Sequence, residues 1–115
     1  MSETDSCIFC KIARGEFGTT FVAESEHAVA FRDIEPKAPT HVLVVPRQHV
    51  RALSELTDGA VAAELLRLAA DVARLEGIVE SGYRVLTNEG PDAGQTVHHL
   101  HLHVMGGHRL SAGLG

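Results

Sequence analysis

The sequence is poor in several features that mark whole classes of protein. It has two cysteines, Cys7 and Cys10, which is too few for a scaffold stapled by disulfides. Its net charge of -5 argues against the basic surface of a nucleic-acid-binding protein, although a local anion site is compatible with it. No apolar run approaches the length of a membrane span, and the N-terminus lacks the basic-then-apolar pattern of a signal peptide. We therefore expect a cytoplasmic protein that contacts neither nucleic acid nor membrane.

The composition is that of an ordinary globular protein. The chain has 115 residues, of which 44% are hydrophobic and 22% are charged, and this is enough for one hydrophobic core. We find no internal repeat, low-complexity tract or linker. Residues 1–115 are expected to form a single domain.

Histidines and aliphatic residues alternate near the C-terminus. His99, His101 and His103 are separated by Leu100 and Leu102. In a β-strand successive side chains point to opposite faces, so one face would carry the imidazoles and the other the aliphatic groups. On a helix the same rings would scatter around the axis. The pattern therefore predicts a half-buried strand that carries a row of imidazoles.

A row of imidazoles is suited to two kinds of chemistry. Neutral imidazole is the commonest metal ligand, and it is also a nucleophile and acid–base group near neutral pH. An expression tag is disfavoured, because tags are not interleaved with aliphatic residues. A single histidine is usually just solvated, and His27 and His108 fit that interpretation, as does His49 on its own. Three histidines in register argue for a functional site, either metal-binding or catalytic.

The two cysteines lie in a Cys-x-x-Cys motif near the N-terminus. Residues 7–15 read as a short helical turn that ends at Gly15. A redox pair normally follows a strand in a βαβ unit, which this N-terminus lacks. A metal half-site would need two further ligands, and the chain has spare histidines. Two plain thiols are the remaining alternative.

Several segments are typical strands. They cover residues 21–24, 28–32, 41–46 and 83–87, and the first two suggest a hairpin. The run 41–46 is almost continuously apolar, which predicts a strand buried on both faces and ended by Pro46. With the histidine strand this makes about five strands.

One long helix is predicted over residues 57–76. Thr57 is expected to cap its first turn, Asp58 suits its positive end, and Gly77 suits the left-handed position after its last turn. An apolar stripe at helical spacing should cover one face of the sheet; it consists of Val61, Leu65, Leu68, Val72 and Leu75. One long helix, one short helix and about five strands make an α+β fold.

The loop at residues 88–96 leads directly into the histidine strand. Gly90 and Gly94 let backbone N–H groups approach an anion, and Gln95 and Thr96 add side-chain donors. Ordinary turn chemistry is enough to explain Gly90 and Pro91. A phosphate held by the rest of the loop would lie over the start of the imidazole row.

The histidine segment resembles the signature of the histidine triad (HIT) family. That signature is His-φ-His-φ-His-φ-φ, where φ is apolar, and residues 99–105 match it. Further blocks are similar, in order, to the Hint branch of the family, and they cover residues 7–12, 30–34, 38–41, 88–90 and 94–97. The resemblance extends over nearly the whole chain.

The resemblance implies a homodimeric α+β protein with an antiparallel sheet that binds a purine nucleotide of the AMP type. It implies a hydrolase that cleaves nucleoside 5′-phosphoramidates through a nucleotidyl-histidine intermediate. His101 would be the nucleophile, His99 and His103 would orient it or contact the phosphate and leaving group, and His41 would be a further active-site histidine.

The nucleotide contacts implied by the resemblance fall into three groups. Asp33 would take the ribose hydroxyls, while His101 and His103 would contact the phosphate. The other phosphate-binding positions would be Asn88, Gly94, Gln95 and Thr96. The apolar slot for the base would be formed by Ile8, Phe9, Ile12, Phe31 and Ile34.

The resemblance also implies a structural zinc ion and no organic cofactor. Its ligands would be Cys7, Cys10, His49 and His99, an accepted tetrahedral set. The alternatives for function are a dinucleotide polyphosphate hydrolase of the Fhit-like type and a non-catalytic module that binds nucleotide or zinc. The chain lacks the Trp-containing tail of animal Hint proteins, which leaves the leaving group open.

Overall fold

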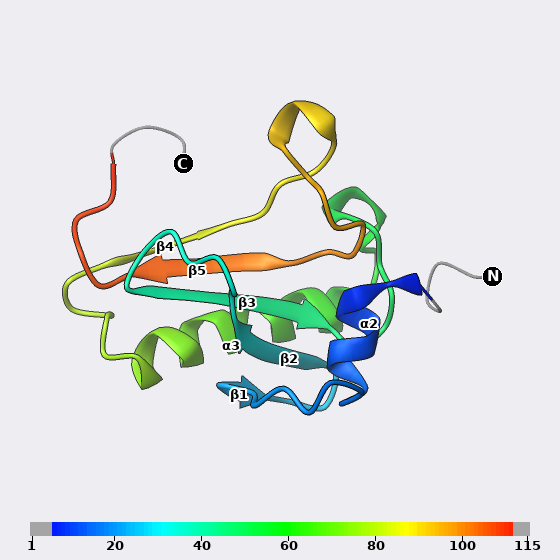
Figure 1. The fold of residues 1–115 in the computed structure, drawn as a ribbon, viewed down its shortest axis with the longest axis horizontal. Helices are drawn as coiled ribbons and strands as arrows, with labels where there is room; N and C mark the ends of the chain where they lie inside the picture. The colour runs from blue at the N-terminus through cyan, green and yellow to red at the C-terminus, as the bar shows by residue number, and fades with distance from the viewer. Residues whose placement is uncertain (1–5, 112–115) are drawn as a thin grey trace.

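The protein is built on a five-stranded antiparallel sheet in the order β1-β2-β3-β5-β4 (Figure 1). The structure is a computed structural model and describes residues 6–111. The strands are β1 (Ala23–Glu24), β2 (Ala28–Arg32), β3 (Thr40–Pro46), β4 (Tyr83–Leu86) and β5 (Leu102–Gly106). The helices are α2 (Ile8–Ala13) and α3 (Gly59–Leu75), with short 3-10 turns η1 (Leu53–Glu55) and η2 (Pro91–Ala93). The expected α+β fold with an antiparallel sheet is confirmed.

The alternation of side chains in β3 separates two apolar clusters on opposite faces of the sheet. Val42 and Val44 belong to the cluster that contains the buried stripe of α3. Leu43 and Val45 belong to the second cluster, which contains Phe9 of α2. Every residue of β3 is buried, as the continuous apolar run predicted. The sheet thus has α3 on one face, while α2 covers only part of the other.

Helix α3 begins and ends almost where the sequence predicts, with two corrections. The cap is Asp58 and not Thr57, because the Asp58 carboxylate accepts the amides of Ala60 and Val61. Leu75 is 64% exposed and does not belong to the buried stripe. Ala69 and Ala73 are buried instead. The buried face of α3 therefore includes these two small residues and does not include Leu75. Gly77 has a φ of 71°, the left-handed conformation expected after the last turn.

Strand β5 is shorter than the histidine pattern predicts. It begins at Leu102, so His99 and His101 lie in the chain just before it. The ladder between β3 and β5 ends at the pair Val44–Leu102, two residues before Pro46. Pro46 has no amide hydrogen, and its carbonyl accepts a hydrogen bond from the His99 ring. The chain at 99–101 is thus held by other contacts, and the three rings do not share one strand face.

The other predicted elements are present, although β1 covers only Ala23–Glu24 of the predicted 21–24 and β4 ends at Leu86 instead of residue 87. Cys7 caps the short helix α2, and Gly15 follows it with a φ of 80°.

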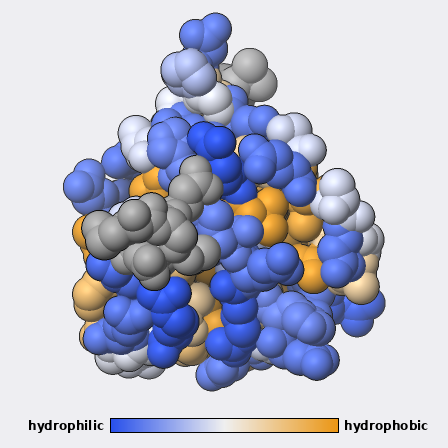
Figure 2. All heavy atoms as spheres, turned by 90° about the vertical axis from the view of Figure 1, so that its right-hand side faces the viewer, coloured by the Kyte–Doolittle hydropathy of each residue, from blue (hydrophilic) through white to orange (hydrophobic). Residues whose placement is uncertain are grey.

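On the side of the molecule shown in Figure 2, apolar surface forms patches between hydrophilic side chains. Within residues 6–111, no helix is both long enough and apolar enough to cross a membrane.

Candidate functional site

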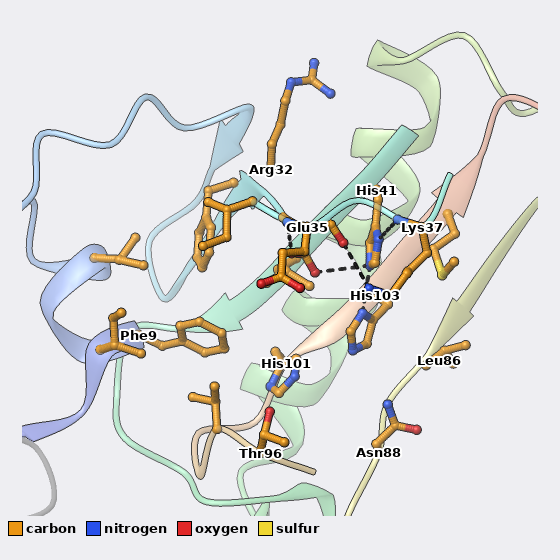
Figure 3. A pocket seen from close by; sticks show the side chains of 18 of the residues that line it. Phe9, Arg32, Glu35, Lys37, His41, Leu86, Asn88, Thr96, His101 and His103 are labelled. Carbon is orange, nitrogen blue, oxygen red and sulfur yellow. Dashed lines mark hydrogen bonds and ion pairs between the residues drawn. The ribbon is translucent and has the colours of Figure 1, made fainter. Parts of the chain in front are cut away.

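A cavity of about 960 Å³ lies on the sheet face opposite α3 (Figure 3). Its walls come from α2, from β2 and β3, from β5 and β4, and from the loop 88–97. His41, His101 and His103 all line it, although they come from two different strands and the segment before β5. The cavity therefore gathers three of the four histidines that were predicted to be catalytic.

The His101 ring lies between Phe9 and His103 (Figure 3). Its centroid is 5.1 Å from that of Phe9 and 5.0 Å from that of His103. Its Nδ1 lies 2.7 Å from the backbone carbonyl oxygen of His99. A carbonyl only accepts, so Nδ1 carries the hydrogen and, in the neutral ring, Nε2 carries the lone pair. The backbone thus holds His101 as the tautomer whose Nε2 is nucleophilic.

The His103 tautomer is set by a chain of hydrogen bonds that starts at Lys37. The Lys37 amide donates to Nδ1 of His41 at 2.9 Å, so a neutral His41 carries its hydrogen on Nε2. Nε2 of His41 is 2.9 Å from Nδ1 of His103, which must therefore accept. The hydrogen of His103 is left on Nε2, which is buried and has no hydrogen-bond partner within residues 6–111. His103 thus keeps an N–H donor available.

Both rings of this pair are held neutral near pH 7. Burial lowers the pKa of His103 to about 4, and the neighbouring His101 and His41 act in the same direction. Burial also lowers the pKa of His41, although Asp33 opposes that shift. The hydrogen-bond chain therefore needs no charge to persist at neutral pH.

Asp33 is fixed beside these histidines. One of its carboxylate oxygens accepts the Glu35 amide at 2.8 Å, and the other lies 3.5 Å from Nε2 of His41. Asp33 lines the cavity, and so do Asn88, Gly94 and Thr96 among the predicted phosphate positions. The fourth predicted phosphate residue, Gln95, is not among the described residues that form the cavity wall.

The residues predicted for the base slot all belong to the cavity wall. These five are Ile8, Phe9, Ile12, Phe31 and Ile34. The rings of Phe9 and Phe31 meet edge to face with centroids 5.6 Å apart. Ile34 is 93% exposed, which places its side chain at the rim of the cavity.

Cys7, Cys10, His49 and His99 form a second cluster beside the cavity. Nδ1 of His99 lies 3.2 Å from the sulfur of Cys7 and 3.4 Å from that of Cys10. Nδ1 of His49 lies 3.3 Å from the sulfur of Cys10. One ligand atom from each of the four residues can be chosen so that all lie within 4.8 Å of one another. The expected ligand set is therefore brought together in space.

The chemistry of the four side chains fits zinc. Ideal tetrahedral coordination places sulfur and nitrogen ligands about 3.6 Å apart, close to the distances found here. Nε2 of His99 lies 2.8 Å from the Pro46 carbonyl oxygen and donates to it, so its lone pair is on Nδ1, which faces the sulfurs. Burial, with a contribution from Cys7, raises the pKa of the Cys10 thiol to about 12. A dication at the centre would reverse that preference and favour the thiolate.

The His99 ring therefore differs from the other rings of the triad. It faces the cysteines, is fully buried, and is not among the described residues that line the cavity. Within the triad it is linked to His101 by the hydrogen bond that its backbone carbonyl accepts, while its ring meets that of His49 edge to face with centroids 5.1 Å apart. Any catalytic part for His99 would thus be exerted through its carbonyl group.

Some cavity residues were missed by sequence reasoning. Leu43 and Met105 line the cavity, each two residues beyond a predicted site histidine in the same strand. Strand alternation would have identified both, because residues two apart share a face. Lys37 and Glu35 also line the cavity, but no local pattern connects their backbone amides with His41 and Asp33.

The fold and the cavity together define a small sheet protein that presents adjacent histidines to a ligand pocket. The family model described as HIT domain matches residues 14–110, so the chain belongs to the HIT family. The resemblance inferred from the sequence is thereby confirmed.

Relatives of known description agree with this assignment. The chain is 37% identical over 108 residues to a purine nucleoside phosphoramidase from Escherichia coli K12, covering 92% of this chain and 91% of the relative. It is 43% identical over 112 residues to a 14 kDa zinc-binding protein from Zea mays, covering 90% and 84%. The crystal structure of a HIT family hydrolase from Legionella pneumophila Philadelphia 1 superimposes with a TM-score of 0.90 at 41% identity, covering 95% of this chain and 99% of that one.

Proposed function

We propose that this protein hydrolyses purine nucleoside 5′-phosphoramidates to AMP-type nucleotides through a covalent intermediate on His101. The observation that carries the proposal is the hydrogen bond from Nδ1 of His101 to the His99 carbonyl, which leaves Nε2 nucleophilic within the cavity. Support comes from the Escherichia coli relative, which is named for this activity.

The first step would transfer the nucleotidyl group to the enzyme. Nε2 of His101 attacks the α-phosphorus, a P–N bond to His101 forms, and the P–N bond to the leaving group breaks. The departing nitrogen accepts a hydrogen bond from the Nε2–H of His103, the donor at the end of the Lys37–His41 chain, and takes up a proton from solvent. The leaving group is thus released as a neutral amine.

The second step would restore the enzyme. A water molecule attacks the phosphorus, keeps one hydrogen on the new P–OH group and returns its other proton to solvent, which balances the proton taken up in the first step. The bond between phosphorus and His101 breaks, and the products are a nucleoside monophosphate and the original two imidazoles. Splitting one displacement into two lowers the barrier that each step must cross.

The other cavity residues would bind the nucleotide. Gly94 and Thr96 line the cavity and would face the phosphate, where backbone N–H groups of such a loop would stabilise the charge that develops on the phosphate oxygens. Asn88 would add a side-chain donor. Asp33 would accept hydrogen bonds from the ribose hydroxyls, with the base held between the apolar residues of the base slot.

A structural zinc ion is part of this proposal. Cys7, Cys10, His49 and His99 would hold it, and when bound it would supply a crosslink and no chemistry at phosphorus. Cys7 and Cys10 belong to the start of α2, which carries part of the base slot. His99 precedes the nucleophile. These four residues would therefore hold the base slot against the segment that carries His101.

We also propose that residues 1–115 act as a single domain that works as a homodimer in the cytoplasm. Strand β4 is at the edge of the sheet, and its Tyr83 and Val85 are 37% and 38% exposed. A second copy of the chain could cover these half-exposed apolar side chains at the sheet edge. Free cysteines suit a reducing compartment. Light scattering at micromolar concentration should give the dimer mass, and a monomer mass would overturn this part.

The test of function is a comparison of wild type with His101→Asn. Asparagine is polar and of similar size, so fold and AMP affinity should persist while turnover falls by several orders of magnitude. His98→Asn, at the exposed neighbouring histidine, is the matched control and should keep the wild-type rate. Acid quenching of wild type during turnover should trap the nucleotidyl adduct.

The substrates should be purine nucleoside phosphoramidates and dinucleoside polyphosphates, with product release followed by chromatography. Faster cleavage of the dinucleotides would point to a dinucleotide polyphosphate hydrolase. Binding without release would point to a non-catalytic module. A His101→Asn protein that keeps most of its phosphoramidase rate would contradict the assignment of the nucleophile.

A further inference from the structure

The side chain of Gln95 connects three separate stretches of backbone. Its Oε1 accepts the Gly90 amide at 3.0 Å. Its Nε2 donates to the carbonyl oxygens of Arg51 at 2.9 Å and Val97 at 3.1 Å. The backbone amide of Gln95 adds a fourth bond, to the Gly90 carbonyl at 3.1 Å.

These partners determine the orientation of the amide and use up its donors. An oxygen must face the Gly90 N–H, and the NH₂ group must face the two carbonyls, because the opposite orientation would oppose like groups. Both hydrogens of Nε2 are therefore engaged. The Gln95 side chain retains no donor for a phosphate, and Gly94 and Thr96 line the cavity on either side of it.

The bonds made by Gln95 close the loop that contains these phosphate positions. Gly90 has a φ of 86° and precedes η2, while Val97 lies directly after Thr96. A second clamp lies nearby, where the Glu89 carboxylate accepts both the amide and the hydroxyl of Ser54. The loop is thus tied to itself and to the segment 51–54.

We propose that Gln95 is a positioning residue that shapes the phosphate-binding loop and makes no direct contact with the nucleotide. Its amide holds the loop so that the backbone around Gly94 and Thr96 is oriented towards the phosphate before the ligand arrives. Preorganised donors bind an anion more tightly than donors that must be ordered on binding. This inference rests on the proposed function, because it assumes a nucleotide in the cavity.

Two substitutions test the role of the amide. Gln95→Ala removes all three side-chain hydrogen bonds. Gln95→Glu keeps the size and an acceptor for Gly90, but it turns an oxygen towards the carbonyls of Arg51 and Val97. Gln48→Glu is the matched control, because it makes the same change at an exposed glutamine.

Three quantities should be measured for each protein: hydrogen exchange of the Gly90 amide without ligand, the affinity for AMP, and the affinity for adenosine. In Gln95→Ala the Gly90 amide should exchange at least several-fold faster, because its acceptor is gone. AMP affinity should fall roughly tenfold in both Gln95 variants, because the lost hydrogen bonds are expected to change the dissociation constant by about that factor. Adenosine affinity should stay within about twofold of wild type, since the base slot is untouched.

The outcomes separate this role from its rivals. Weaker AMP binding with unchanged Gly90 exchange in Gln95→Ala would overturn the inference in favour of direct contact. Equal losses for AMP and adenosine would also overturn it, because they would indicate general loosening of the fold. Unchanged AMP affinity would exclude any part in phosphate binding. If wild type turned over no phosphoramidate, the proposed function would fail. The measurements of Gly90 exchange and of AMP and adenosine affinity would still test whether Gln95 positions the loop.

Discussion

Acidification should destabilise the folded protein through His103. Burial lowers the pKa of this ring to about 4 in the folded state, against about 6.5 in an unfolded chain. Between these two values the unfolded chain binds a proton that the folded protein does not. Stability is therefore fully present above pH 6.5 and is lost as the pH falls towards 4.

The size of the effect follows from the two pKa values. At pH 5 an unfolded His103 is almost fully protonated, while the folded one is mostly neutral. Linkage then gives a loss of about 2 kcal/mol in the free energy of unfolding between pH 7.5 and pH 5. Protonation of His103 would also add charge beside His41. Burial lowers the pKa of His41 as well, so protonation of either ring at low pH destabilises the folded state.

The assay is urea unfolding of wild type and His103→Asn at pH 7.5 and pH 5, followed by circular dichroism. Asparagine can accept the hydrogen from Nε2 of His41 but does not titrate in this range. The variant should lose about 2 kcal/mol less than wild type over the same interval. Titrating groups that make no contact with His103, such as His99, contribute to both proteins and cancel in the difference.

A second substitution controls for the loss of a histidine as such. His108→Asn removes an exposed ring and should leave stability at pH 7.5 close to that of wild type. Equal losses between pH 7.5 and pH 5 in wild type and His103→Asn would show that His103 is not buried in its neutral form. The assignment of the His103 tautomer through the hydrogen bonds from Lys37 and His41 would then fail.

Two further predictions concern the metal cluster and the core. Protein purified without chelator should contain close to one zinc ion per chain by metal analysis, and Cys10→Ser should lose most of it. Removing zinc from wild type should weaken AMP affinity, because α2 would be less firmly held; retention of zinc by Cys10→Ser would contradict the site. Leu65→Ala should cost about 2–5 kcal/mol in denaturant unfolding, since Leu65 is 2% exposed under the sheet. Leu66→Ala, at a neighbour that is 62% exposed, should cost less than about 1 kcal/mol, and equal costs would refute the assigned helix face.

The local pattern of the sequence determined which faces of the elements are buried. The apolar run of β3 required cover on both sides, and Val42 and Leu43 do pack into opposite clusters. The spacing of His101 and His103 placed both rings in one cavity, because residues two apart in an extended chain share a face. These outcomes depend only on local backbone geometry, so they can be predicted from the sequence without knowledge of the tertiary structure.

The local pattern was less reliable at the ends of elements. Thr57 and Asp58 are both good capping residues, and only the final hydrogen bonds of the helix select Asp58. Leu75 fits the apolar periodicity, but its exposure depends on which face of α3 packs against the sheet, and that face includes Ala69 and Ala73. Propensity and periodicity do not contain that information.

Tertiary structure alone decided how the polar groups of the site are paired. His99 alternates with His101 in sequence, yet its ring faces the cysteines because the Pro46 carbonyl holds its Nε2. Gln95 looks like a phosphate donor in sequence, yet the carbonyls of Arg51 and Val97 take both of its hydrogens. A hydrogen bond is directional and its partner can come from any distance along the chain, so spacing in the sequence determines the face of a side chain but not the atom it meets.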